Sequence, residues 1–211
     1  RKPPKPGPIY PLIARAQLGN GNHSKAIEAA DLALKYGPDL EARKLRAAAR
    51  FANKDYEGTI TDIEFLKENN VELDRHLLEW LGFAYHGLKQ PEQGQEAFSQ
   101  MIDRFPNHYS GYADLALYYI DTGRLEEAQK LIQQALVREQ KQPQLYMEKA
   151  ELDLLSGNDK AALEAADQAL SLKPDYLAAL ELKAGIAFKN SSFEETLLNL
   201  NKLIDADPAN W

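Results

Sequence analysis

The sequence predicts an all-α protein built as a linear stack of similar helix pairs, an α-solenoid. Pro38, Pro106, Pro174 and Pro208 are separated by 68, 68 and 34 residues, all multiples of 34. Glycines and paired alanines recur in one phase of the same period: Gly21, Gly123, Gly157, Ala26, Ala128, Ala162, Ala33, Ala135 and Ala169. A fixed period of this length is typical of a stacked array of one supersecondary unit.

The period divides the chain into a leading tail and one array of six units. Residues 1–6 are rich in proline and lysine and are interpreted as a linker. The array covers residues 7–211, with units 7–40, 41–74, 75–108, 109–142, 143–176 and 177–211. Each unit contains two amphipathic segments joined by a short polar turn, so the sequence predicts twelve helices and no strands.

Unit 109–142 shows these elements most clearly. Apolar residues recur at i, i+3, i+4 and i+7 over 110–121 and again over 125–137, which predicts two helices. Gly123, between them, is expected to end the first helix, because glycine takes the left-handed conformation without a Cβ penalty. Pro106, Pro174 and Pro208 are expected to end second helices, since proline cannot continue the hydrogen-bond ladder.

The first two units depart from this pattern. Pro8 and Pro11 fall inside the first helix of unit 7–40, so that helix is expected to start late. Unit 41–74 has Lys54 in a turn that lacks glycine and is one residue short. Thr59 and Leu66 replace its two alanines. These departures affect local geometry and leave the fold class unchanged.

The recurring alanines identify the closest helix contacts. Ala128 and Ala135 lie seven residues apart, as do Ala162 and Ala169, so each pair faces the same neighbour across two helical turns. We therefore expect these four alanines to be nearly fully buried.

The residues resemble the tetratricopeptide repeat (TPR) family. Unit 75–108 carries Leu81-Gly82, Tyr85, Phe98 and Pro106, which is similar to the pattern L-G-x2-Y…F…P. The resemblance covers nearly the whole chain. It implies a right-handed superhelix whose first helices line a concave groove. Because Trp211 falls on the first position of a further unit, the chain is interpreted as a fragment of a longer repeat-containing protein.

Composition excludes several partners and sites. With 25 basic and 32 acidic residues the net charge is −7, so the chain lacks the basic stripe that binding nucleic acid requires. It has no cysteine, which excludes disulfides and cysteine-ligated metal and is compatible with the cytoplasm or the bacterial periplasm. No apolar run approaches the length of a membrane span. The sequence therefore predicts a soluble segment in a compartment that it does not identify.

Catalytic motifs are absent from the sequence. The four histidines, His23, His76, His86 and His108, show no i, i+4 pairing suited to metal. We therefore expect no enzyme activity, no cofactor and no metal site.

The resemblance implies which side chains face the groove. It places there His76, Glu79, Trp80, Phe83, His86, Asp114, Leu117, Ile120, Asp121, Gln144, Met147, Glu148, Glu151, Glu181 and Lys189. Trp80 and Phe83, three residues apart, would form one apolar anchor. Alternatively, Trp80 packs between first helices as core. The carboxylates either form an acidic binding surface or are simply solvated.

The leading functional interpretation is a non-catalytic protein-interaction scaffold that binds a peptide or partner protein in the concave groove. A carboxylate-lined groove favours a basic or amine-bearing ligand over an acidic one. Only Arg15 and Arg46 match the basic clamp with which one TPR subclass holds peptide carboxylates, so that ligand is disfavoured.

The alternative is the repeat segment of a bacterial exopolysaccharide export or synthesis assembly. Such a segment would contact an amine-bearing polysaccharide or its modifying enzyme.

Apolar residues on the last segment, 193–204, also predict weak self-association through the open ends of the array.

Overall fold

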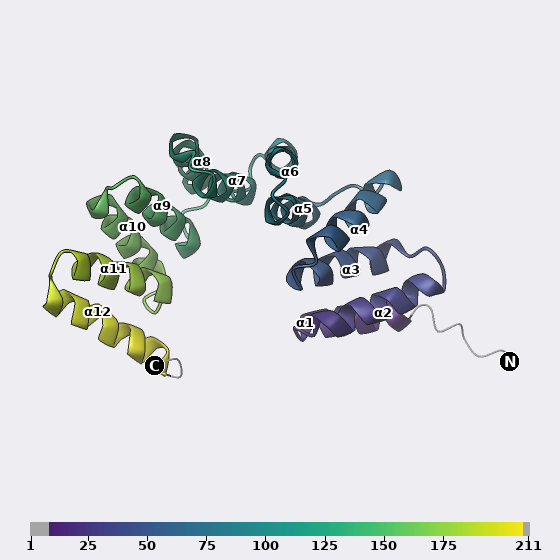
Figure 1. The fold of residues 1–211 in the computed structure, drawn as a ribbon, viewed down its shortest axis with the longest axis horizontal. Helices are drawn as coiled ribbons and strands as arrows, with labels where there is room; N and C mark the ends of the chain where they lie inside the picture. Colours follow the sequence, from purple (N-terminus) through teal and green to yellow (C-terminus); the bar gives the residue numbers. More distant parts are fainter. Residues whose placement is uncertain (1–8, 209–211) are drawn as a thin grey trace. The chain divides into compact units, whose positions relative to one another are not determined.

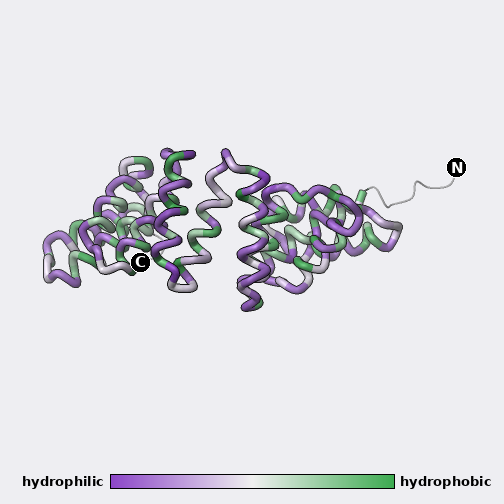
Figure 2. The backbone as a smooth tube through the Cα atoms, turned by 90° about the horizontal axis from the view of Figure 1, so that it is seen from above, coloured by the Kyte–Doolittle hydropathy of each residue, from purple (hydrophilic) through white to green (hydrophobic). Residues whose placement is uncertain are grey.

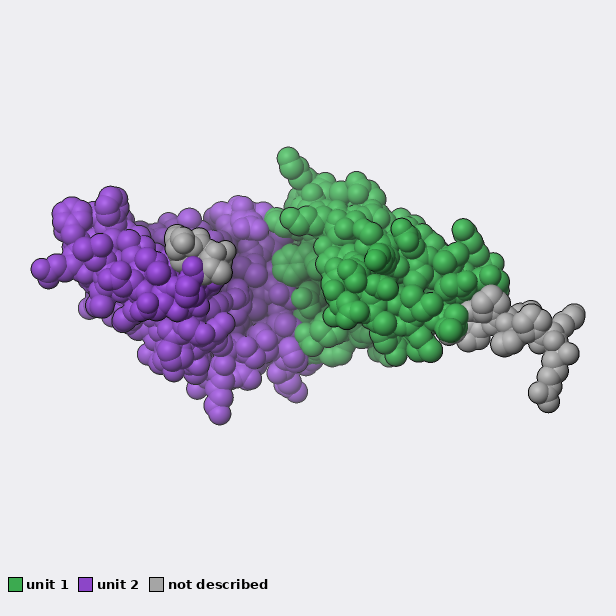
Figure 3. All heavy atoms as spheres, turned by 90° about the horizontal axis from the view of Figure 1, so that it is seen from below, with its two compact units in different colours: residues 1–105 green, residues 106–211 purple. Residues whose placement is uncertain are grey.

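The computed structural model describes residues 9–208, and these form twelve α-helices and no strand (Figure 1). The prediction of an all-α fold of paired helices is confirmed. The chain divides into two compact units, which are distinct from the six repeat units of the sequence (Figure 3). From here on, unit 1 is the part up to Phe105 and unit 2 is the part from Pro106 onward. The tail at 1–6, Pro8 and Trp211 lie outside the described residues.

The helices follow one another in pairs along each unit. Unit 1 contains α1 (Ile9–Gly19), α2 (His23–Lys35), α3 (Leu40–Ala52), α4 (Tyr56–Glu68), α5 (Arg75–Gly87) and α6 (Pro91–Arg104). Unit 2 contains α7 (Ser110–Asp121), α8 (Leu125–Arg138), α9 (Pro143–Leu155), α10 (Asp159–Leu172), α11 (Leu177–Lys189) and α12 (Phe193–Ala206). The expected helices at 110–121 and 125–137 correspond to α7 and α8.

Sequence signals account for where the helices begin and end. Pro106, Pro174 and Pro208 stand two residues beyond the last residues of α6, α10 and α12, as predicted. The α1 helix begins at Ile9 and carries Pro11 in its first turn. Proline is tolerated there because the first amide groups of a helix have no intrahelical hydrogen-bond partner. Hydrophobic and hydrophilic residues alternate in bands along the helices, as amphipathic segments require (Figure 2).

The turn inside every helix pair contains one residue in the left-handed conformation. These residues are Gly21, Lys54, Lys89, Gly123, Gly157 and Ser191, with φ between 58° and 76°. Glycine adopts this conformation freely, whereas a side chain there costs about 1–2 kcal/mol. The turn geometry therefore persists in the pairs α3–α4, α5–α6 and α11–α12 although they lack the glycine.

The recurring alanines are buried, as the period predicts. Ala128, Ala135, Ala162 and Ala169 each have 0% of their surface exposed. In unit 1, Thr59 stands in an alanine position and is also fully buried. Its hydroxyl donates a hydrogen bond to the carbonyl oxygen of Asp55 at 2.7 Å, so the polar atom is satisfied within its own helix turn.

Replacing Ala162 by leucine will lower the free energy of unfolding by about 1–3 kcal/mol, because α10 packs closely against α9 and α11. Urea denaturation of the whole chain measures the change. The matched control is Ala161→Leu, one residue earlier on the same helix, where the side chain is only half-buried. Equal midpoints for the Ala162 variant and the unmodified chain would contradict the close contact.

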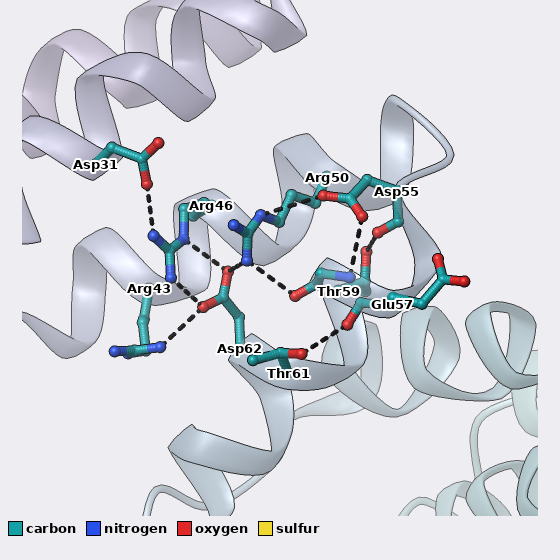
Figure 4. A network of polar contacts seen from close by, with 10 residues as sticks. Asp31, Arg43, Arg46, Arg50, Asp55, Glu57, Thr59, Thr61 and Asp62 are labelled. Atoms are coloured by element: carbon teal, nitrogen blue, oxygen red, sulfur yellow. Dashed lines mark hydrogen bonds and ion pairs between the residues drawn. The ribbon is translucent and has the colours of Figure 1, made fainter.

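A buried carboxylate connects three helices of unit 1 (Figure 4). Asp62, on α4, is fully buried and accepts hydrogen bonds from three α3 arginines, Arg43, Arg46 and Arg50, at 2.6–3.0 Å. Arg46 also donates to Asp31 on α2 at 2.5 Å. The bonds to Asp62 raise the pKa of Arg46, despite partial burial. Ion pairs therefore link α4 to α3, and through Arg46 to α2.

Unit 2 ends in an incompletely covered helix. In unit 2 each helix packs against the next one in sequence, and α7 also contacts α9. On α12 the side chains of Phe193, Leu197, Leu200 and Ile204 are exposed. Self-association through this surface stays a prediction. Among residues 9–208, no helix is both long enough and apolar enough to cross a bilayer.

Candidate functional site

A pocket of about 300 Å³ opens on the face that α7, α9 and α11 form in unit 2. We call it the α9 pocket. Its lining residues are Leu117, Gln144, Met147, Glu148, Glu151, Leu154, Tyr176, Ala178 and Leu182. First helices supply all of them except Tyr176, which directly precedes α11.

Helical spacing brings four of these side chains together on α9. Pro143 occupies the first position of the helix, where its fixed φ suits helix initiation. Gln144, Met147, Glu148 and Glu151 then follow at i, i+3, i+4 and i+7 and share one face.

Glu148 is the most unusual residue of the α9 pocket. Only 4% of its surface is exposed. Burial raises the pKa of the Glu148 carboxyl to about 7, and the charge of Glu151 adds to the shift, while a hydrogen bond with Gln144 opposes it. Its Oε2 atom is buried, and no group among residues 9–208 donates a hydrogen bond to it. This oxygen therefore lacks the partner that buried polar atoms normally have.

A polar chain leads from the pocket edge to Glu148. The Tyr176 hydroxyl donates a hydrogen bond to Oε1 of Gln144, and Gln144 in turn bonds the carboxyl of Glu148. Burial raises the pKa of Tyr176, and the nearby Glu148 raises it further. The tyrosine therefore remains a neutral donor at physiological pH and holds Gln144 in place.

The pocket combines apolar walls with acidic groups. Leu117, Met147 and Leu182 supply the walls, and no lysine, arginine or histidine of residues 9–208 lines it. Nor do residues 9–208 contain a group of three or more histidine, aspartate or glutamate side chains that could hold a metal. The arrangement is suited to binding through apolar contact and negative charge.

Five predicted site residues lie on α5 in unit 1. Trp80 is half-buried, packs against the core of unit 1, and stacks on Phe51 of α3 and on His76, with centroid distances of 6.2 and 6.1 Å. Glu79 lies 3.6 Å from the ring of His76. The remaining two, Phe83 and His86, are half-buried, and Phe83 packs edge-on against Phe98 of α6 at 5.0 Å.

The predicted residues of unit 2 fall into two groups. Leu117, Gln144, Met147, Glu148 and Glu151 meet in the α9 pocket. Those outside its lining are Asp114, which is half-buried, Ile120, which is buried, and Asp121, Glu181 and Lys189, which are exposed.

Sequence reasoning missed part of the pocket wall. Tyr176, Leu182, Ala178 and Leu154 line the pocket but were not expected to face a groove. The repeat positions expected to face a groove lie at fixed places within first helices, whereas Tyr176 precedes its helix. An aromatic residue two positions after the turn proline Pro174 was the available signal.

Comparison with known families identifies the repeat. Two family models, both described as tetratricopeptide repeat, match the chain, one over residues 85–152 and one over residues 12–61. The chain is a tetratricopeptide repeat protein. A comparison of the TPR chain with curated proteins finds no significant match.

Solved structures share the TPR fold. A tetratricopeptide repeat protein from Parabacteroides merdae ATCC 43184 is 15% identical, with a TM-score of 0.81 over 98% of this chain and 80% of the other. A thermophilic TPR protein from Thermus thermophilus is 20% identical, with a TM-score of 0.66 over 82% and 94%. YrrB, described as a TPR protein with an unusual peptide-binding site, is 18% identical, with a TM-score of 0.62 over 82% and 90%.

Membership of the family supports a broad class of activity. TPR proteins bind peptides or proteins and are in general non-catalytic scaffolds, and the fold of this chain supports a protein-interaction scaffold. The low identities to solved structures show a common fold alone, so the binding surface must be argued from the residues of this chain.

Proposed function

We propose that the TPR chain is a non-catalytic scaffold that holds an extended peptide segment of a partner protein on the face of α7, α9 and α11. The observation that carries this proposal is the α9 pocket, an apolar cavity with converging polar groups. YrrB, which shares the fold, is described as having a peptide-binding site, and this supports the same class of ligand here.

Apolar side chains around the pocket supply the contact area. Leu117, Met147 and Leu182 come from three successive first helices of unit 2, so one bound segment would touch all three. Leu154, at the end of α9, also lines the pocket and is exposed. Fully burying an exposed side chain of this size is worth about 1.5–3 kcal/mol, and because Leu117, Met147 and Leu182 are half-buried already, each would contribute a part of that.

The stack of Phe51, Trp80 and His76 is a separate candidate anchor in unit 1. Trp80 is half-buried and already packs against the core, so its remaining surface adds less apolar contact than a free indole. The α9 pocket combines several apolar side chains with an unpartnered buried carboxylate oxygen, so we assign the primary contact to it and treat the Trp80 surface as a secondary one.

The wall chemistry favours a peptide over a polysaccharide. Sugar rings bind against the flat faces of aromatic side chains, but leucine and methionine form most of this pocket wall. Tyr176 is its one aromatic member among residues 9–208, and the hydroxyl of that residue is engaged with Gln144. An amine-bearing polysaccharide is accordingly an outcome of the test below and is not a second proposal.

Selection from a random peptide display library tests the proposed surface. Peptides enriched on the unmodified chain are expected to bind the variant Leu117→Asp with Leu182→Asp at least about tenfold more weakly, a loss of about 1.4 kcal/mol. The matched control is Val137→Asp, which places the same charge on α8, where the side chain is 78% exposed. A parallel arm with partly deacetylated chitin fragments measures polysaccharide binding.

Three outcomes would contradict the proposal. One is equal affinity of the enriched peptides for the unmodified chain and the aspartate variant. Another is loss of binding on Trp80→Ala alone, which would place the primary contact in unit 1. The third is tight binding of the chitin fragments with no enrichment of peptides.

A further inference from the structure

We infer that the α9 pocket takes the primary ammonium group of a lysine side chain, with the Glu148 carboxylate as its counter-charge. This inference rests on the proposed function, since the lysine would belong to the bound peptide segment. It names the chemistry that the pocket selects.

The orphaned oxygen of Glu148 is the first argument. Oε2 is buried, and residues 9–208 offer it no hydrogen-bond donor. Burying an unpaired carboxylate costs several kcal/mol, and a cation that donates to the free oxygen removes much of that cost. The folded chain therefore carries an unsatisfied acceptor that a positive ligand group would complete.

The charges around Glu148 give the second argument. Glu151, one turn further along α9, is a second carboxylate at the same pocket. The neighbouring helices contribute neutral groups: α7 gives Leu117, and α11 gives Ala178 and Leu182. Tyr176 is neutral and bonds to Gln144. The described lining thus contains two acids and no base, so charge complementarity selects a cation.

The number of free acceptor oxygens on Glu148 distinguishes ammonium from guanidinium. Gln144 bonds the Glu148 carboxyl, so a single oxygen, Oε2, remains to accept. A guanidinium prefers two free oxygens of one carboxylate in a planar fork, whereas an ammonium acts as a point donor. The aliphatic wall of Leu117, Met147 and Leu182 suits the methylene stem of a lysine, which packs along apolar surface while its head reaches a polar group.

Access to the carboxylate requires a movable side chain. Met147 precedes Glu148 on α9 and is only half-buried. Its unbranched thioether has three rotatable bonds and repacks readily. Because Met147 lines the same pocket, its side chain can make room when the ammonium group enters.

The two methionines of the chain allow a direct measurement. Met147 lines the pocket, while Met101 is 1% exposed in the core of unit 1 and serves as an internal reference. With ¹³C-methyl methionine, NMR titration uses the probe acetyl-Ala-Leu-Lys-Leu-Ala-amide and two counterparts carrying norleucine or arginine in place of the lysine. The Met147 methyl resonance is expected to shift with the lysine probe, while Met101 stays unchanged.

The affinities are expected to depend on the ammonium group of the probe. The lysine probe should bind at least about tenfold more tightly than the norleucine probe. Glu148→Gln should reduce the lysine probe to the norleucine level. The charge-matched control Glu164→Gln, exposed on α10, should leave the affinities unchanged. Calorimetry near pH 6.5 in buffers of different ionisation enthalpy should show proton release, because the ammonium displaces the proton of Glu148.

Equal affinity for the lysine and norleucine probes, or lysine binding that survives Glu148→Gln, would overturn the inference. The shift of Met147 with the norleucine probe would still support the peptide site, so the proposed function would stand. Tighter binding of the arginine probe would show that the pocket selects guanidinium and would overturn the inference too. If no probe moves Met147, the ammonium subsite is refuted, and the display selection independently decides the proposed function.

Discussion

Replacing Asp62 by asparagine will destabilise unit 1 by about 3–5 kcal/mol, the largest loss that we expect from a single substitution. Asp62 is the fully buried acceptor for Arg43, Arg46 and Arg50, whose side chains are only 13–20% exposed. Asparagine keeps the size of the side chain but removes the negative charge. The three guanidinium groups would then repel one another in a partly buried space.

Urea denaturation followed by circular dichroism measures this effect. The control is Asp31→Asn, since Asp31 also pairs with Arg46 but is 43% exposed. Because the carboxylate of Asp31 remains in contact with solvent, its pair with Arg46 is worth about 1 kcal/mol or less, so the control should change stability little. A loss below about 1 kcal/mol for Asp62→Asn would show that the arginines can turn outward to solvent.

Replacing Glu148 by glutamine will stabilise unit 2 above neutral pH by about 3 kcal/mol. The pKa of Glu148 is about 7 in the folded chain, against an ordinary value of 4.5. Each pKa unit corresponds to about 1.4 kcal/mol. Between these two values the folded state binds more protons than the unfolded state, so the stability of the unmodified chain falls as pH rises from about 4.5 to 7. Glutamine removes this cost because it carries no charge.

Unfolding measured at pH 4 and at pH 8 tests the sign. The variant should gain most at pH 8 and should show a flatter dependence between the two values. Glu151→Gln, at an exposed position on the same helix, is the control and should change stability by less than about 0.5 kcal/mol. The same gain at both pH values would mean that Glu148 is not protonated on folding.

The sequence was sufficient to predict the helices because the residues that repeat with the period are those that end a helix or allow two helices to pack closely. Gly123 and Pro106 mark the ends of helices through backbone conformation alone, and Ala162 marks a contact too close for a larger side chain. The buried network around Asp62 could not be predicted in this way. Arg43, Arg46 and Asp62 resemble an ordinary solvated surface until α3 and α4 are packed together.

The candidate site was predictable in part for the same reason. Helical spacing alone is enough to place Gln144, Met147, Glu148 and Glu151 on one face of α9. The burial of Glu148 depends on its neighbours, which the period of a single helix does not specify. Tyr176 was missed because it belongs to a turn and not to a helix face.

The six left-handed turn residues have a consequence for the order in which the helix pairs close during folding. A pair joined through Gly21, Gly123 or Gly157 can form its turn directly from the unfolded chain, because glycine visits the left-handed region freely. The pairs joined through Lys54, Lys89 and Ser191 must restrict a side chain to a conformation that it rarely adopts, and neighbouring helices have to compensate for this. We therefore expect the α1–α2, α7–α8 and α9–α10 hairpins to close first during folding, and the remaining pairs to form against them.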